Sequence, residues 1–224
     1  MQVIFMDLFP IYLSLKVAAY STLIVIIIGT PLGWLMARGI FFGKSLLSSF
    51  ITLPLVLPPT VLGYYLLVLI GRQSFLGNFL FNTFGINLIF TWQAAVIAAS
   101  IVSLPLLART VQAGIEAIDT DLEDVARTLG RSEIVIFFTI TLPLSWQSII
   151  AGMVLAFARA MGEFGATLMV AGNIPGKTQT LSVAIYDAVQ AGNSQLANML
   201  VIIISILTIA VLLTLNKVTK IKRW

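Results

Sequence analysis

The hydrophobic pattern of the chain is dominated by long stretches without a charged side chain. These stretches run over Val17–Ala37, Ser45–Gly71, Gln73–Ala108, Ile134–Ala158 and Ala188–Asn216. Each exceeds the roughly 20 residues that an α-helix needs to span about 30 Å of hydrocarbon. We therefore predict five transmembrane helices, near residues 12–36, 46–70, 90–111, 147–171 and 196–215.

Polar residues interrupt this pattern in two places on one side of the predicted helices. The Asn- and Gly-rich segment near Gly77–Asn87 predicts a loop before the third helix, which we expect to begin near Phe90. Residues 172–195 form a second loop, which we place outside the cytoplasm. Within it we predict a short helix over Gln179–Gln190, which contains Asp187 and is too short to cross a membrane.

Composition supports an integral membrane protein and limits its chemistry. Of the 224 residues, 59% are hydrophobic and 10% charged, and the mean hydropathy is +1.03, whereas a soluble domain has roughly 25% charged residues. The chain has no Cys and no His, which removes thiolate metal sites and the commonest metal ligand and general base. No paired carboxylates lie within the predicted crossings. We therefore expect no catalytic residue, no metal and no cofactor bound by this chain.

The basic residues predict the orientation in the membrane, because Lys and Arg concentrate in cytoplasmic loops. One side would include the loop 38–44, the loop 109–145 and the tail 216–224, with Arg38, Lys44, Arg109, Arg127, Arg131, Lys217, Lys220, Lys222 and Arg223. The other side would have Lys16, Arg72 and Lys177. The N-terminus is then outside and the C-terminus cytoplasmic. No basic segment precedes the first stretch and no A-x-A site follows it, so we expect no cleaved signal peptide.

The most informative polar segment is residues 119–143. Thr120 and Glu123 fit a capping box that starts a helix, and Gly130 suits the left-handed residue that ends it. One face of this helix is apolar, at Leu122, Val125, Ala126 and Leu129. A second short helix should run from about Ser132 and end before Pro143. The segment is either a helical hairpin lying on the membrane surface or a docking element whose apolar stripe enters a groove on a cytoplasmic partner.

The spacing in this segment resembles the cytoplasmic EAA loop of ATP-binding-cassette (ABC) importer permeases, E-A-A-x3-G-x9-I-x-L-P. The matching positions are Asp124, Val125, Ala126, Gly130, Ile140, Leu142 and Pro143. Asp and Val replace the Glu and one Ala of the motif; Asp124 keeps the charge with a shorter reach, and Glu123 stands next to it. We call residues 119–143 the EAA loop. The resemblance implies that this loop couples the chain to an ATPase through Glu123, Asp124, Val125, Ala126, Leu129, Gly130, Ile140, Leu142 and Pro143.

Three further segments resemble molybdate permeases of the same family. They are Leu53–Tyr65, Ala158–Ala166 and Gly172–Thr180. Sulfate/thiosulfate permeases share a Gly-Glu-Phe-Gly-Ala segment, so that motif alone separates the two groups poorly. The resemblance covers residues 10–215, as one ABC transmembrane type-1 domain.

The resemblance implies an all-α, polytopic permease with the type I ABC importer (MetI-like) fold. It further implies a homodimer in the cytoplasmic (inner) membrane, two cytoplasmic ABC ATPase subunits that use ATP and Mg, and an extracytoplasmic molybdate-binding protein, with no nucleic-acid partner. Five helices are few to enclose a polar path alone, which also favours a dimer. A sulfate/thiosulfate or tungstate permease stays an alternative, as does an ATP-independent anion channel or carrier.

Two groups of residues are candidates for the translocation path or its gate. Pro54, Pro58 and Pro59 interrupt the second predicted helix, either as a packing kink or as a kinked, pore-lining gate. Arg159 and Glu163 are the only charges that we place well inside a crossing, at i and i+4 on one helix face. They are either a structural ion pair or part of an anion path.

Three glycine patterns have simpler interpretations than their motifs suggest. Gly39–Ser45 and Gly172–Thr178 resemble the phosphate loop G-x4-G-K-[ST] but have three intervening residues, and neither follows a soluble strand. We therefore expect no ATP binding by this chain. The Gly29-x3-Gly33 pattern predicts a helix-packing face or a dimer contact.

Overall fold

The computed structural model describes the backbone of residues 8–220 and the side chains up to Thr214. Within these residues the chain is helical and contains no strand, which confirms the all-α prediction. The elements are α1 Phe9–Arg38, α2 Lys44–Val56, α3 Pro59–Ile70, α4 Phe75–Phe84, α5 Trp92–Glu116, α6 Thr120–Thr128, α7 Glu133–Ile136, the π-helix η1 Phe137–Thr141, α8 Leu142–Leu144, α9 Trp146–Met161, α10 Gly165–Ala171, α11 Leu181–Gln190 and α12 Ser194–Lys220.

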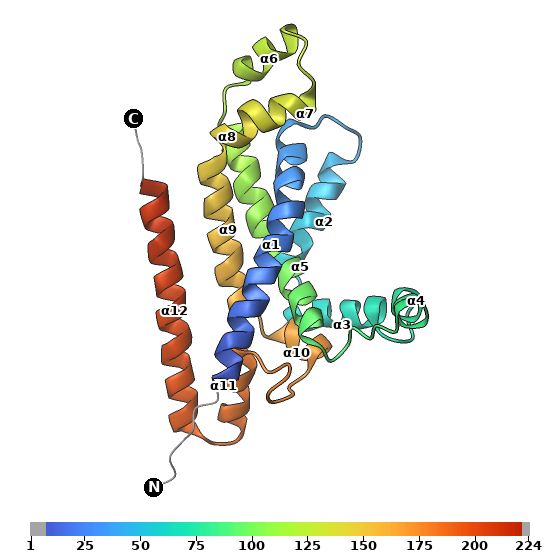
Figure 1. Cartoon of the computed structure of the whole chain (residues 1–224), viewed down its shortest axis with the longest axis vertical. Coiled ribbons are helices and arrows are strands. Elements are labelled where there is room, and N and C mark those ends of the chain that lie inside the picture. The colour runs from blue at the N-terminus through green and yellow to red at the C-terminus, as the bar shows by residue number, and fades with distance from the viewer. Residues whose placement is uncertain (1–7, 221–224) are drawn as a thin grey trace.

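The centre of the molecule is formed by α1, α5 and α9, which run side by side along its long axis (Figure 1). Helix α5 is the most enclosed of them, and five of its alanines are almost completely buried, at Ala94, Ala95, Ala98, Ala99 and Ala108. Small side chains let helix backbones approach closely. A Cβ atom at Gly33 of α1 would lie 2.8 Å from the carbonyl oxygen of Ala108. Gly29 and Gly33 therefore form a packing face against α5 within the chain.

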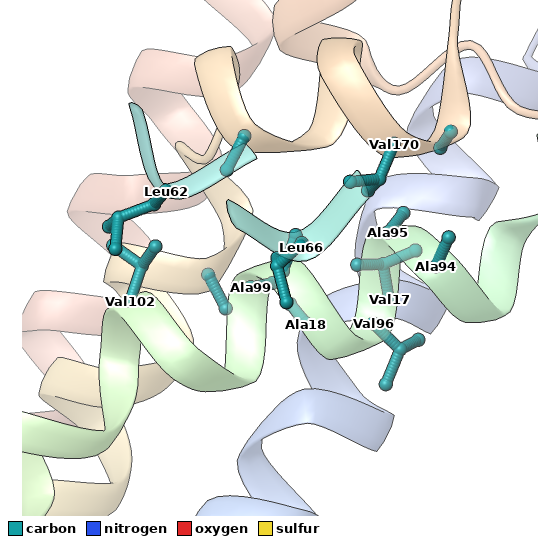
Figure 2. Packing of buried hydrophobic residues seen from close by; sticks show 14 of the residues in the cluster. Val17, Ala18, Leu62, Leu66, Ala94, Ala95, Val96, Ala99, Val102 and Val170 are labelled. Atoms are coloured by element: carbon teal, nitrogen blue, oxygen red, sulfur yellow. The ribbon is translucent and has the colours of Figure 1, made fainter. Parts of the chain in front are cut away.

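A second part of the core lies where α1, α3, α5 and α10 meet (Figure 2). Leu62 and Leu66 of α3 point toward Val102 and Ala99 of α5, and Val170 of α10 lies in the same cluster. These contacts hold the short helices α3 and α10 against the central helices. They place the two breaks described next beside each other.

The prediction of a single helix over residues 46–70 is wrong, because the chain bends by 115° between α2 and α3. Leu57 and Pro58 are extended, with ψ of 141° and 136°. A proline removes a backbone donor and disfavours the helical conformation of the residue before it, so Pro58 and Pro59 in sequence end one helix. Pro59 then occupies the first turn of α3, where its missing N–H is harmless.

The helix predicted over residues 147–171 is also divided. Helix α9 ends at Met161, residues 162–164 are not helical, and α10 begins at Gly165. The preceding helical run was predicted to end before Pro143 but continues to Leu144, because Pro143 lies in the first turn of α8, where no N–H is needed. This run is bent by 74° from α9.

Two further boundaries differ from the prediction. The segment near Gly77–Asn87, predicted as a loop, contains α4: Ser74 accepts a hydrogen bond from the Gly77 N–H (2.9 Å), and Gly85 ends the helix with a φ of +67°. Asn78 and Asn82 lie inside this helix, where the Asn82 amide donates a hydrogen bond to the Asn78 side-chain oxygen at 2.8 Å. Helix α5 extends to Glu116, beyond the predicted residue 111, so the first part of the predicted loop 109–145 is helical.

By length and composition, α1, α5 and α12 can each cross a membrane. The two bent pairs, residues 44–70 and 133–161, bring the number to as many as five if each is one span. In α12 only 11% of the apolar window is buried, against 67% in α5, so most of its side chains are free to face lipid. The predicted tail is helical as far as Lys220, and Lys222 and Arg223 lie outside the described residues.

Candidate functional site

The EAA loop forms one end of the molecule, where α6 and α7 project beyond the long helices (Figure 1). The residue that caps α6 is Asp119, whose Oδ1 accepts a hydrogen bond from the Asp121 N–H at 3.0 Å. The predicted cap at Thr120 is therefore wrong by one residue; a carboxylate also interacts favourably with the positive end of the helix dipole. Gly130 has a φ of +77°, the left-handed conformation expected where the helix ends.

Glu123 attaches α6 to the rest of the chain. Its side chain is 1% exposed, and its Oε2 lies 2.8 Å from the Nε of Arg38, the last residue of α1. Thr141 in η1 donates a hydrogen bond to the other carboxylate oxygen at 2.8 Å. Arg38 also donates to the carbonyl of Ile118 (2.9 Å), just before α6. The end of α1, the EAA helix and the π-helix are thereby joined through one buried carboxylate.

Asp124, the position that matches the glutamate of the EAA motif, is 60% exposed and pairs with Arg127. Arg127 also holds Glu133 of α7, with 2.6 Å between Nε and Oε1. The hydrogen bond from Arg127 lowers the pKa of Glu133, and Glu133 and Asp124 together raise the pKa of Arg127. The buried acidic residue of this loop is therefore Glu123, one position before the motif match.

The apolar stripe predicted on α6 divides into two parts. Leu122, Val125 and Leu129 are exposed by 51%, 59% and 75%, whereas Ala126 is buried against the chain. At the other end of the motif, Ile140 and Leu142 are half-buried and Pro143 is exposed. Helix α6 thus presents three large apolar side chains outward while its inner face is attached by Glu123. This arrangement has the geometry of a docking helix.

The structure brings most of the candidate path residues together. The Nη1 of Arg159 lies 2.8 Å from the Oε2 of Glu163, and the Glu163 side chain is 2% exposed. Its Oε1 accepts a hydrogen bond from the Ala166 N–H (3.0 Å), so Glu163 also satisfies the start of α10. A Cβ at Gly165 would lie 2.9 Å from Pro59. The bend at Pro58 and Pro59 therefore meets the break at residues 162–164, and Pro54 stays inside α2, one turn earlier.

Sequence reasoning did not predict the contacts of two further cations in the long helices. The ammonium of Lys16 in α1 lies 3.9 Å from the ring centroid of Trp92. Arg109 lies in α5 and contacts α2. Both partners lie far away in the sequence, so spacing along the chain carries no signal of these contacts. Among the residues with described side chains, no group of three or more Asp or Glu residues could hold a metal ion.

The fold defines an all-α, multi-pass membrane protein with a short helix, anchored through Glu123, that projects at one end. The sequence matches the family described as "Binding-protein-dependent transport system inner membrane component" over residues 29–221. The chain is 46% identical over 206 residues to the molybdenum transport system permease protein ModB of Escherichia coli K12, covering 91% of this chain and 90% of that protein.

Two further similarities support this assignment. The putative molybdenum transport system permease protein YvgM of Bacillus subtilis is 48% identical over 188 residues, which is 84% of this chain and 83% of that protein. The solved structure of the MetNI methionine ABC transporter, in an inward-facing conformation, has the same fold with a TM-score of 0.71 at 17% identity, over 94% of this chain and 93% of that one. The chain belongs to the family of binding-protein-dependent transport system inner membrane components.

Proposed function

We propose that this chain is the membrane-spanning permease subunit of an ATP-driven importer of molybdate. Two copies surround one path, two ABC ATPase subunits bind on the cytoplasmic side, and an extracytoplasmic binding protein delivers the oxyanion. ATP and Mg are used by the ATPase, so this subunit has no catalytic residue of its own. The N-terminus is outside and the C-terminus is cytoplasmic.

The observation that carries this proposal is the attachment and exposure of α6. A nine-residue helix is marginal in water on its own, yet here the Glu123 carboxylate anchors it to Arg38 and Thr141. Its outward side chains, Leu122, Val125 and Leu129, are then free to enter an apolar groove on a partner. A hairpin lying in the membrane surface would have no need for such an anchor.

The same contacts suggest how movement of an ATPase reaches the membrane helices. If the ATPase groove that binds α6 moves, Glu123 moves with α6. Because Glu123 forms an ion pair with Arg38, the last residue of α1, the movement also acts on α1. Helix α1 packs closely on α5 through Gly29 and Gly33, so a displacement of α6 acts on the central helices. In this proposal the bend at Pro58 and Pro59 and the break beside Glu163 allow α3 and α10 to move relative to those helices.

The experiment is uptake by the assembled transporter in proteoliposomes. The chain is purified with its ATPase subunit, reconstituted, and supplied with the loaded binding protein and radiolabelled molybdate. ATP-dependent accumulation of molybdate supports the proposal, and competition with tungstate and sulfate tests the alternative substrates. Uptake that proceeds without ATP or the ATPase subunit would instead indicate a channel or carrier.

The helix contacts also lead us to place substrate choice in the binding protein. Arg159 is neutralised by Glu163, and a path that conducts must release its ion readily. Replacing Arg159 with Gln should therefore slow molybdate and tungstate uptake alike, without changing their preference ratio. A several-fold change in the molybdate-to-sulfate ratio would place a selectivity filter in this subunit.

A further inference from the structure

Arg109 lies in a polar cluster between α2 and α5 that none of the preceding roles explains. Its Nη2 donates hydrogen bonds to the hydroxyls of Ser48 (2.7 Å) and Thr52 (2.6 Å), and its Nη1 donates to the Gln112 side-chain oxygen (2.9 Å). All four residues are partly exposed. Arg109 is seven residues before the end of α5, which corresponds to about 10 Å along the helix axis.

The positive charge of Arg109 is not neutralised within the described part of the chain. It forms no ion pair there, whereas Arg159 pairs with Glu163 at 2.8 Å. The acid nearest in its hydrogen-bond network is the exposed Glu116, which accepts from Gln112 and not from Arg109. Neutral oxygens solvate the guanidinium and leave its net charge in place.

Two hydrogen-bond donors of the cluster remain free for a ligand. A guanidinium has five N–H groups, and one hydrogen on Nη1 has no acceptor among the described side chains. The Ser48 hydroxyl accepts from Arg109 but donates to none of the described residues. A cation with two neighbouring free donors is suited to bind an oxyanion weakly.

The membrane environment limits where the exposed edge of this cluster can face. An arginine at membrane depth costs about 3 kcal/mol or more, so such residues face protein or a water-filled cavity. Lys44, Ser48 and Thr52 recur at every fourth position of α2 and so share one helix face. Lys44 also has no ion-pair partner among the described residues. Two cations without an ion-pair partner in the described part of the chain, Arg109 and Lys44, therefore lie along this face, and Lys44 is at the end of α2 on the side of the EAA loop.

We propose that Arg109, together with Ser48, forms a water-accessible, low-affinity site for a divalent oxyanion near the cytoplasmic end of the path. This inference rests on the proposed function for its path and its orientation. The site attracts the leaving anion by its unpaired charge, and it releases the anion because it offers only one guanidinium N–H and one hydroxyl. Arg109 therefore supplies uncompensated positive charge to the path, whereas the Arg159–Glu163 pair is electrically neutral.

Thiol labelling measures the local charge directly, because the chain has no cysteine of its own. Ser48→Cys is introduced into the assembled transporter in inside-out vesicles, and labelling of this chain by a sulfonate-bearing and a quaternary-ammonium methanethiosulfonate is followed by mass spectrometry. We expect the anionic reagent, corrected for its intrinsic rate, to react about tenfold faster. Adding Arg109→Gln should bring the ratio close to one.

Matched variants separate this site from a structural role. Arg159→Gln, added to Ser48→Cys in place of Arg109→Gln, should leave the labelling ratio within about twofold, because it alters the neutral pair away from the cluster. No labelling by either reagent, or a ratio unaffected by Arg109→Gln, would overturn the proposal. If Arg109→Gln fails to assemble, Arg109→Lys is used instead. It retains the positive charge but loses the several guanidinium hydrogen bonds, and it should keep the preference for the anionic reagent.

Transport provides the second test. At a fixed concentration of loaded binding protein, Arg109→Gln should reduce molybdate uptake about tenfold, and Arg109→Lys should stay within about threefold of the parent. Equal loss in both variants would mean that Arg109 acts only as a clamp between α2 and α5. If the parent imports no oxyanion, the proposed function fails, whereas the labelling ratio still reports whether the Arg109 charge faces water.

Discussion

At the scale of single residues, the carboxylate of Glu123 connects three segments that are separate in the sequence. It is buried with Arg38 on one oxygen and Thr141 on the other. A buried ion pair is not in itself a strong source of stability, but removing one partner leaves the other charge uncompensated. The pair therefore fixes where α6 can sit on the end of α1.

Replacing Glu123 with Gln should detach α6 from α1. The substitution leaves Arg38 unpaired and should lower the free energy of unfolding by about 3 kcal/mol, measured by denaturation of the purified protein in detergent. In the assembled transporter, molybdate imported per ATP hydrolysed should fall. Asp124→Asn is the control, since this neighbouring carboxylate is exposed and its pair should contribute less than about 1 kcal/mol. Equal effects of the two variants would contradict the role of Glu123.

The Arg127–Glu133 contact gives the loop a mild pH dependence. Because the hydrogen bond from Arg127 lowers the pKa of Glu133 from its ordinary value of 4.5, its stabilising effect is complete above that value. It is lost as the pH falls through the lowered pKa of the folded protein. We expect Glu133→Gln to unfold at a slightly lower temperature than the parent at pH 7, and this difference to shrink as the pH falls below 4.5. A difference that stays constant as the pH is lowered would contradict this.

At the scale of elements, α6 shows how a short helix acquires an exposed apolar face. Its own hydrogen bonds are too few to stabilise it, and tertiary contacts through Glu123 and Ala126 replace them. The larger apolar residues Leu122, Val125 and Leu129 consequently need not pack against the rest of the chain. Because they are exposed, a partner can bind them.

Leu129→Asp should uncouple the ATPase from transport without harming the fold. Leu129 is 75% exposed, so the substitution should change the free energy of unfolding by no more than about 0.5 kcal/mol, while a charge in an apolar groove should weaken ATPase binding at least tenfold. Co-purification and ATPase activity measure the effect. Deleting residues 220–224 is the control and should leave coupling intact; release of the ATPase by that deletion alone would place docking in the tail.

The contact between α1 and α5 depends on glycine at position 33. Gly33→Val would push a side chain into the backbone oxygen of Ala108 and the side chain of Val111, which should destabilise the protein by about 1–3 kcal/mol. Ala19→Val adds bulk to the exposed side of the same helix and should have little effect. Thermal unfolding of both variants in detergent distinguishes them. A neutral Gly33→Val would mean that the two helices do not pack this closely in the membrane.

At the scale of the whole molecule, the helices give the two ends different characters. The EAA loop lies at the end where α12 finishes, while α1 begins and α11 lies at the opposite end (Figure 1). The basic residues predict that the EAA end is cytoplasmic. The predicted orientation therefore places the end of α12 on the same side as the EAA loop.

Thiol labelling tests this orientation. A cysteine at Gln2 should react with a membrane-impermeant reagent added outside intact cells, and a cysteine at Thr219 should react only after the membrane is opened. The parent chain contains no cysteine, so its own background labelling is absent. The reverse pattern would overturn the orientation, whereas labelling of both positions, or of neither, from outside would indicate an even number of crossings.

The sequence by itself determined the membrane class, the all-α fold and the location of the EAA loop. These properties depend on local composition and spacing. The backbone polar groups of a long uncharged stretch must be hydrogen-bonded within a helix when the stretch lies in lipid. A motif is recognised from the number of residues between its members. The Gly130 helix end and the Arg159–Glu163 pair also follow from spacing alone, since i and i+4 share a helix face.

Tertiary structure alone decided which charges are neutralised and where the helices change direction. Two consecutive prolines predict a break, but its angle of 115° is set by the packing of Leu62 and Leu66 on α5. Glu123 and Asp124 are both acidic and adjacent in sequence, and only the position of Arg38, 85 residues before Glu123, makes the first of them the buried one. Arg109 remains unpaired because α2 brings it hydroxyls and no carboxylate. Such long-range neighbours carry no local signal, because the free energy of a charge depends on what surrounds it in space.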